Sequence, residues 1–254
     1  MNQHANIIAR VSASVLSDIE GLDADACGFC RAGCAVLPDS LPKSFEPLLN
    51  HIFQSSKIPP TEWNNTATNV PGYEAASKLL KASTDFPQAK LTAFYNPSAE
   101  PHHLVMRYRP DTSDVSITTF TGVPEGELPL PTTKGVIATD RSDETFLFVC
   151  SHRRRDDRCG YCGPVLVDLL QKSLFEKLGG DAEKFPVLPC SHIGGHTYAG
   201  NVLLYSKAGG MCFGCVTPQD VDLLTSYVIS QKSGGVLPPE LGAKVRGTMD
   251  AKQA

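Results

Sequence analysis

The pattern of apolar and polar positions in the first half of the chain predicts a few helices and a group of strands. Residues 1–26 have the pattern of a short helix and a linker, while residues 48–53 (LLNHIF) and 73–83 (YEAASKLLKAS) have helical spacing. Apolar runs rich in β-forming residues predict strands at residues 90–96, 103–109 and 113–120.

The second half has a different rhythm, in which apolar strands alternate with helical stretches. Residues 121–143 are rich in Gly, Pro and acidic residues, so we expect a connection between two domains there. Residues 146–150 (FLFVC) predict a buried strand, and a helical pattern runs from Pro164 to the glycine pair 179–180. Later runs predict strands at residues 185–190, 201–206 and 211–216 and a last helix with Thr217 as its N-cap.

These elements indicate an α/β protein with two domains. We expect an N-terminal α/β domain at residues 1–135, a C-terminal domain at residues 136–235 and a mobile tail at residues 236–254. The C-terminal elements follow the order strand, loop, helix, strand, loop, two strands and helix. This order is compatible with a small thioredoxin-like domain.

Composition and charge limit the classes of binding partner and the cellular compartment that we expect for this protein. The chain has 254 residues and a net charge of −4, so we expect no nucleic-acid partner. No apolar run approaches the roughly 20 residues of a membrane helix, and the first residues lack a long apolar secretion segment. We therefore expect no membrane partner and a cytoplasmic protein. A mitochondrial location stays open, because the only charged residue before Asp18, apart from histidine, is Arg10.

Nine cysteines are the strongest chemical signal in the composition. Their number is odd, and several form close pairs that cannot easily connect distant segments. In a reducing compartment, such clusters indicate metal or redox chemistry more often than structural disulfides.

Four Cys and His residues follow two predicted strands that we expect to be neighbours. Cys150 ends one strand, and Cys159 follows in a charged loop, whereas His192 and His196 come just after another strand. A glycine pair at 194–195 separates the histidines and disfavours a helix between them. A glycine loop lets backbone N–H groups approach a buried anion, and a cluster with bridging sulfides needs such hydrogen bonds.

Three segments of the second half resemble the sucrase/ferredoxin-like family, which includes the fungal actin-patch-distribution proteins. They are C-S-H-x-x-R-x-D-x-C-G at residues 150–160, C-S-H-x-G-G-H-x-x-A-G-N at residues 190–201 and G-x-V-T-P-x-D-V at residues 214–221. The resemblance covers about 90 residues strongly and the N-terminal half only loosely. It is specific because both paired motifs occur in this order and spacing.

The resemblance implies a thioredoxin-like ferredoxin domain with a [2Fe–2S] cluster. Carried onto this chain, the cluster and metal ligands are Cys150, Cys159, His192 and His196. As in Rieske centres, we expect the two imidazoles on one iron and a higher potential than in all-cysteine ferredoxins. The implied function is one-electron transfer, with coupled proton uptake at the histidines, between donor and acceptor proteins that the sequence does not identify. An electron carrier is favoured over an enzyme with its own substrate, and nothing supports sugar chemistry.

Two other readings of the cysteines stay open. Cys159 and Cys162 form a CGYC that fits a thiol-disulfide oxidoreductase or redox sensor. The third reading is a zinc-stabilised interaction module. Its candidate thiolates are those of Cys27, Cys30, Cys34, Cys212 and Cys215, and the CFGC at 212–215 departs from the family pattern.

The charged loop at residues 153–158 lies between two of the expected ligands. Its simplest reading is a solvated loop. The functional reading is a positive patch that docks an acidic redox partner, with Arg158 beside Cys159 raising the potential of the cluster.

Overall fold

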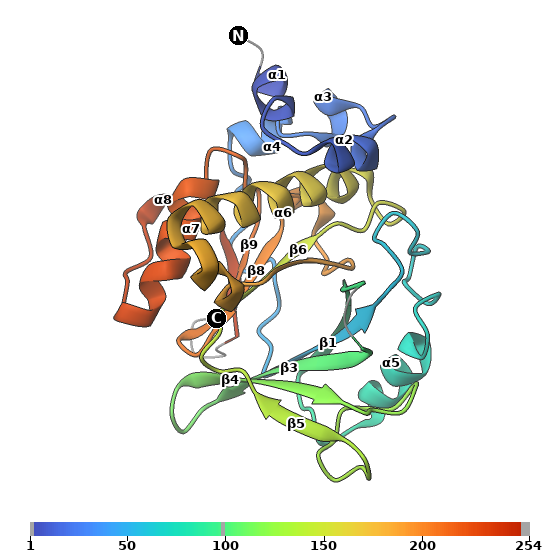
Figure 1. Ribbon diagram of the computed structural model, residues 1–254. Helices are drawn as coiled ribbons and strands as arrows, with labels where there is room; N and C mark the ends of the chain where they lie inside the picture. The colour runs from blue at the N-terminus through green and yellow to red at the C-terminus, as the bar shows by residue number, and fades with distance from the viewer. Residues whose placement is uncertain (1–2, 98–99, 250–254) are drawn as a thin grey trace.

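A single mixed sheet organises the computed structural model, which describes residues 3–97 and 100–249 (Figure 1). The strand order within the described residues is β10-β9-β8-β6-β7-β2-β1-β3-β4-β5. The strands are β1 (Asn50–Ser56), β2 (Ala89–Tyr95), β3 (His102–Arg109), β4 (Asp114–Thr121), β5 (Ile137–Asp140), β6 (Phe146–Cys150), β7 (Val187–Cys190), β8 (Val202–Ser206), β9 (Gly209–Phe213) and β10 (Val245–Thr248).

Helices cover the sheet and form most of the N-terminal segment. In Figure 1 the long α6 crosses above β6, β8 and β9, the N-terminal helices lie beyond it, and α5 lies beside the β1–β3 part of the sheet. The α-helices are α1 (Gln3–Ile8), α2 (Ala13–Ile19), α3 (Ala24–Cys27), α4 (Ala32–Ala35), α5 (Tyr73–Ala82), α6 (Asp157–Leu178), α7 (Val221–Ser230) and α8 (Pro239–Gly242). Short 3₁₀ helices are η1 (Gly179–Lys184), η2 (His196–Tyr198) and η3 (Gln231–Ser233).

The sheet and its core run through both halves of the chain. Strands β2 and β7 pair at Phe94 and Cys190, which joins the N-terminal strands to the C-terminal ones. The rings of Phe53 on β1 and Phe148 on β6 stack with centroids 3.7 Å apart in one shared apolar core. The protein is therefore a mixed α/β protein with one large mixed sheet, and its division into two domains stays a prediction.

Most of the expected elements are confirmed, but the helix expected at residues 48–53 is wrong. Strand β1 begins at Asn50 and lies between β2 and β3, with all but one of its seven residues buried. A short apolar run in a strand covered on both faces has no alternation, so its spacing does not distinguish it from a helix. The helix expected at residues 73–83 is present as α5.

Helix α6 begins seven residues before the expected start at Pro164. The side chain of Asp156 caps the helix by accepting a hydrogen bond from Arg158 N at 3.0 Å. Pro164 lies inside the helix, where its missing N–H removes one backbone hydrogen bond without ending the helix. Cys159 therefore lies in the first helical turn and not in a loop.

The C-terminal segment also differs from its prediction. The last helix begins at Val221 with Asp220 as its N-cap residue, so the prediction of Thr217 as the N-cap is wrong. Thr217 instead donates its N–H and Oγ1–H to Asp220 Oδ2 at 2.7 and 2.8 Å. The expected mobile tail, in its described part, contains α8 and the edge strand β10, which pairs with β9 and buries Arg246. Residues 250–254 lie outside the described residues. Nowhere in the described ranges is a helix long and apolar enough to cross a bilayer.

Candidate metal centre

The centre lies where the parallel strands β6 and β7 end side by side. Cys150, the last residue of β6, is in register with Cys190, the last residue of β7. Residues 191–201, here named the histidine loop, therefore leave the same sheet edge as the segment that connects β6 to α6. Cys150 is 1% exposed, so its sulfur is inside the protein at this edge.

Close approach of α6 to β6 brings the second cysteine to the first. Cys159 is fully buried in the first turn of α6. One turn later, Gly163 packs against Ser151 and the carbonyl of Cys150, where a Cβ atom would collide. A glycine is thus required at 163 to hold the helix start against the end of β6.

His192 completes a group of three potential ligands. Its Nδ1 atom is 4.0 Å from Cys150 Sγ, and the ligand atoms of Cys150, Cys159 and His192 all lie within 4.8 Å of one another. The structure therefore brings together three of the four predicted ligands, from β6, α6 and the histidine loop. In the described part of the chain, no second group of three Cys, His, Asp or Glu side chains comes together in this way.

His196, the fourth predicted ligand, lies beside this group. Its ring centroid is 5.7 Å from that of His192, with an interplanar angle of 30°. Its Nδ1 is 3.9 Å from Asp156 Oδ2, and its side chain is 45% exposed. The glycines between the two histidines have φ values of +92° at Gly194 and +67° at Gly195, so the backbone is left-handed there and no α-helix connects the histidines, as the glycine pair predicts.

A hydrogen bond between the side chains of Cys150 and Cys159 shifts their pKa values in opposite directions. A hydrogen bond from Cys159, followed by the neighbouring His192, holds the pKa of Cys150 well below its usual value. The hydrogen bond to Cys150, together with burial, raises the pKa of Cys159 well above its usual value. Cys150 is therefore the thiolate of the pair, positioned at the N-terminal end of α6, where the helix dipole favours negative charge.

His152 connects the histidine loop to Asn64 through hydrogen bonds, a role that the sequence did not predict. His152 Nε2 donates to Asn64 O at 2.7 Å, and its Nδ1 accepts from the backbone N–H of His192 at 3.3 Å. Burial lowers the pKa of His152, so it is the neutral ring that fits this pattern. The signal was available, because His152 is the histidine of the first C-S-H segment.

None of the other cysteines belongs to the group of three ligand atoms within the described residues. Cys162 is fully buried, and its sulfur accepts a hydrogen bond from Arg31 Nη1 at 3.2 Å; burial raises its pKa to about 12. The sulfur of Cys34 accepts a hydrogen bond from Arg31 Nη2 at 3.2 Å. No four-thiolate group from Cys27, Cys30, Cys212 and Cys215 assembles in the described residues, and every cysteine is free.

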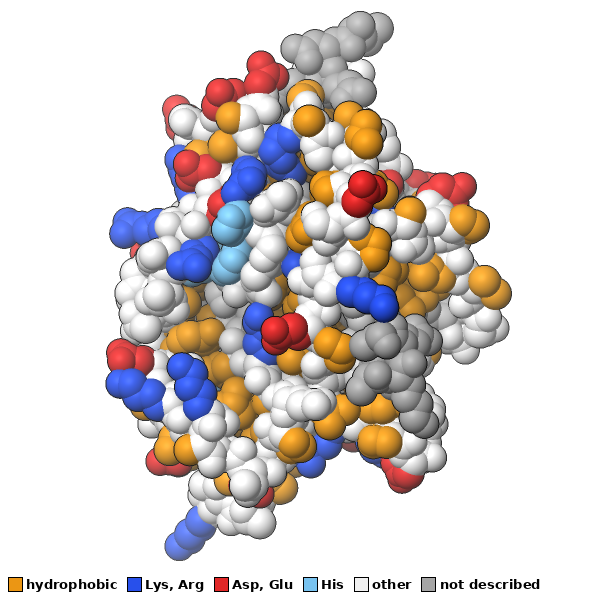
Figure 2. Space-filling view, turned by 180° about the vertical axis from the view of Figure 1, so that it is seen from behind, with side chains coloured by type: hydrophobic (Ala, Val, Ile, Leu, Met, Phe, Trp, Pro, Cys, Tyr) orange, Lys and Arg blue, Asp and Glu red, His pale blue; other side chains and the backbone are white. Residues whose placement is uncertain are grey.

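The charged loop has two separate roles in the structure. Arg153 donates to the carbonyls of Asp18 and Glu20 at 2.8 and 2.9 Å, which fastens the N-terminal helices, and Arg158 pairs with Asp156 at 2.9 Å. Arg154 and Arg155 are exposed. Figure 2 shows histidine side chains at the surface with Lys and Arg side chains around them.

The fold and the site define a mixed α/β protein with a candidate Cys–Cys–His metal centre at one sheet edge. A family model described as sucrase/ferredoxin-like matches residues 12–247. The chain belongs to the sucrase/ferredoxin-like family.

Similar curated proteins come from yeasts and share one name, "Altered inheritance of mitochondria protein 32". The chain is 33% identical to the Candida glabrata protein over 104 residues, which are 37% of this chain and 30% of that protein. It is 42% identical to the Debaryomyces hansenii protein over 78 residues (30% and 27%) and 36% identical to a Saccharomyces cerevisiae protein over 97 residues (32% and 28%). The matches span less than a third of these relatives' lengths. No solved structure matches the chain.

Proposed function

We propose that the protein is a one-electron carrier with a [2Fe–2S] cluster held by Cys150, Cys159, His192 and His196. The observation that supports this most is the convergence of two buried sulfurs and one imidazole nitrogen within 4.8 Å, with a second imidazole beside them. Thiolate and imidazole are the donors of Rieske-type clusters, so the donor set fits the group. The cluster, when bound, would supply the one-electron chemistry.

The surroundings of the donors suit such a group. Both cysteines are at most 1% exposed, so water is excluded on that side, whereas His196 reaches the surface. An electron carrier needs this combination, because one side of the group must be dry and the other must lie close to a partner. The family match supports the same ligand set through the segments at residues 150–160 and 190–201.

We also propose that β6, α6, β7, β8, β9 and α7 form the thioredoxin-like ferredoxin unit. The supporting observation is the strand order β9-β8-β6-β7, in which β6 and β7 are parallel and β8 and β9 are antiparallel to their neighbours. The helix α6 connects the two parallel strands. The ligands Cys150 and Cys159 are then the end of the first strand and the start of the first helix of this unit.

Proton uptake is part of the proposal. His192 presents Nδ1 to Cys150, so its Nε2 is the ring nitrogen free to keep a proton. His196 is the more exposed imidazole, and Asp156 lies 3.9 Å from its Nδ1 as an acceptor for a protonated ring. Reduction adds negative charge, so a proton on these rings is held more tightly in the reduced protein.

The thiol-exchange reading has less support. Exchange requires a thiolate, and burial raises the pKa of Cys162 to about 12 while the hydrogen bond to Cys150 raises that of Cys159. The exposed Arg155, which lines one pocket together with His192, supports an acidic redox partner. The relatives' name refers to the inheritance of mitochondria, which supports the mitochondrial alternative to a cytoplasmic location.

The decisive experiment is iron and acid-labile sulfide analysis of anaerobically purified protein, with an EPR spectrum after dithionite reduction. We expect about two iron and two sulfide per chain and an EPR signal from the reduced form. Zinc in place of iron would support the interaction-module reading, and a protein without metal would support the thiol reading.

A further inference from the structure

Two cations, the half-buried Lys90 and the buried Arg246, bond the backbone of the histidine loop. Lys90 Nζ donates to the carbonyl of Ile193 at 2.8 Å, and Arg246 Nη1 donates to the carbonyl of Gly194 at 3.1 Å. These two carbonyls are consecutive and lie between His192 and His196. The two cations therefore grip the part of the loop that sets the spacing of the histidines.

Arg246 makes the most extensive of these contacts. It is 1% exposed, and its Nη1 also donates to Asn201 Oδ1 at 2.7 Å, at the other end of the loop. Its guanidinium lies over the ring of Tyr198, with 5.0 Å to the centroid. A Cβ atom at Gly195 would collide with this guanidinium, so the glycine allows the close approach.

A third cation comes from the N-terminal segment. Arg31 Nη2 donates to the carbonyl of Ala199 at 2.8 Å, while Arg31 Nη1 donates to Cys162 Sγ. Lys90 is on β2, Arg246 is on β10, and Arg31 lies between α3 and α4. All three therefore reach the loop from outside the β6–β9 unit that carries the proposed ligands.

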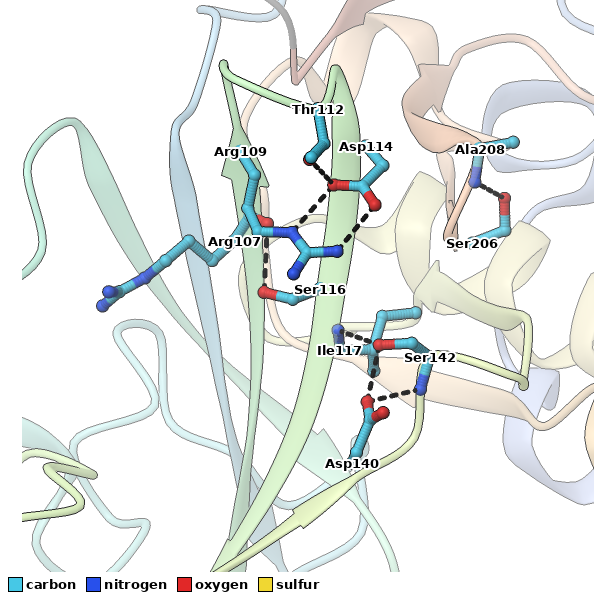
Figure 3. Close-up of polar contacts among 10 residues, drawn as sticks. All are labelled: Arg107, Arg109, Thr112, Asp114, Ser116, Ile117, Asp140, Ser142, Ser206 and Ala208. Atoms are coloured by element: carbon cyan, nitrogen blue, oxygen red, sulfur yellow. Dashed lines mark hydrogen bonds and ion pairs between the residues drawn. The ribbon is translucent and has the colours of Figure 1, made fainter.

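The three cations have no carboxylate partner. None of them is in an ion pair among the residues that the structure describes. Arg109 is the ordinary case for comparison, because its Nε and Nη2 bond both oxygens of Asp114 at 2.8 and 2.6 Å at the surface (Figure 3). Arg246 is buried, and Lys90 and Arg31 are half-buried. Charge withdrawn from water without a counter-charge is unfavourable, so these three cations around one loop require an explanation.

Electrostatics connects Lys90 with the metal centre. Burial lowers the pKa of Lys90, and the neighbouring Arg246 lowers it further, whereas Cys212, the exposed Glu46 and Cys150 oppose that shift. The structure also connects Lys90 with the metal centre directly, because its hydrogen bond to the carbonyl of Ile193 joins it to the residue that follows His192.

We propose that Lys90, Arg246 and Arg31, here named the cation cradle, position the histidine loop and raise the reduction potential of the cluster. The first half of this inference concerns the protein alone, and the second rests on the proposed function. Reduction adds one negative charge, which nearby buried or half-buried cations stabilise more strongly than exposed ones because the interior screens less. The cradle therefore favours the reduced form and fixes the two imidazoles at the same time.

The test compares Lys90→Met and Arg246→Gln with variants that keep the charge, Lys90→Arg and Arg246→Lys. Matched controls are Lys78→Met, at an exposed lysine of α5, and Arg109→Gln in the β3–β4 hairpin. Two quantities are measured on the full chain as purified: hydrogen exchange of the backbone amides at residues 191–201, and the midpoint potential by redox titration.

Lys90→Met and Arg246→Gln should each speed exchange in the histidine loop several-fold and lower the midpoint potential. Lys90→Arg should keep the exchange rate of the histidine loop and the midpoint potential close to their wild-type values. The two control variants should change neither quantity. Arg246 is deeply buried, so if Arg246→Gln fails to fold, Lys90→Met decides the outcome. Unchanged exchange in Lys90→Met overturns the positioning role, and an unchanged potential in a loaded Lys90→Met protein overturns the electrostatic role. A wild-type protein without a cluster overturns the proposed function and leaves the exchange result as the test of positioning.

Discussion

The β3–β4 hairpin and the histidine loop deal with charge in opposite ways. In the hairpin, Arg109 and Asp114 neutralise each other at the surface (Figure 3). At the histidine loop, Lys90 and Arg246 bond only carbonyl, hydroxyl, amide and sulfur groups of the described residues. In the hairpin, the positive charge of Arg109 has a carboxylate partner, whereas the cations at the histidine loop have none among the described residues. The loop is therefore suited to hold a negatively charged group.

This difference shows why the same residue types carry different meaning in the two regions. An exposed ion pair contributes little to stability and is screened by salt. An unpaired buried cation is unfavourable unless something negative lies close to it. The region that stores uncompensated positive charge is therefore the region in which we expect the redox group.

The largest expected effect is the loss of the cluster when a cysteine ligand is removed. Cys150→Ala and Cys159→Ala should each abolish bound iron, because both sulfurs face the centre. Cys162→Ala is the matched control, since Cys162 lies in the same helix but bonds Arg31 instead. Iron content and visible absorption are the measurements. Bleaching by Cys162→Ala with colour retained in Cys150→Ala would show that the ligands are assigned wrongly.

Exchange of a histidine for cysteine should keep a cluster but shift its potential. His192→Cys or His196→Cys should lower the midpoint potential, because a thiolate adds a negative charge that imidazole lacks. His102→Cys, at a half-buried histidine on β3, is the control and should have no effect on the midpoint potential.

In the wild type, the midpoint potential should fall by about 59 mV per pH unit between the oxidised and reduced histidine pKa values, for one proton per electron. A wild-type potential that is constant from about pH 6 to 10 would exclude the coupling.

A smaller effect concerns acid stability in the N-terminal half of the sheet. Burial, helped by His102, lowers the pKa of His103 to about 4, below its ordinary value near 6.5. The unfolded chain thus binds more protons between these values, so stability is full above about pH 6.5 and falls as the pH drops towards 4. The expected loss is on the order of 3 kcal/mol.

His103→Leu tests this expectation, because it removes the titrating ring from the same buried position on β3. Thermal unfolding of both proteins should show a shallower loss of stability in the variant as the pH falls from 6.5 to 4.5. Parallel pH profiles for the two proteins would mean that His103 does not titrate as described.

The smallest effect is expected at the exposed ion pair of the hairpin. Hydrogen bonds from Arg109 and Thr112 hold the pKa of Asp114 at about 2, so the pair persists above that pH and is lost only as the pH falls through this value. Asp114→Asn should leave iron content and midpoint potential unchanged at pH 7, and its unfolding midpoint should stay close to that of the wild type. A shift in potential would contradict the separation of the two regions.

The sequence was sufficient for the elements whose signals are local. Strand β6 has the bounds that the run FLFVC predicts, and α5 follows its helical spacing. The segments at residues 150–160 and 190–201 predicted a site whose first three residues do converge. These signals depend on neighbouring residues, which a single sequence displays directly.

The parts that failed depend on residues far apart in the chain. The helical spacing at residues 48–53 was overruled because β1 is covered on both faces. The cap at Asp156 started α6 before Pro164, and pairing of β10 with β9 placed Arg246 under the histidine loop. No local pattern indicates that Lys90, Arg31 and Arg246 meet, because the sheet and the N-terminal segment bring them there.

The measurement that tests the central claim most directly is pulsed EPR of the dithionite-reduced protein with ¹⁵N-labelled histidine. We predict hyperfine coupling from two imidazole nitrogens, and the loss of one coupling in His192→Cys and of the other in His196→Cys. A reduced cluster without nitrogen coupling would contradict the mixed ligation. A protein without iron would contradict the assignment of the site as a whole.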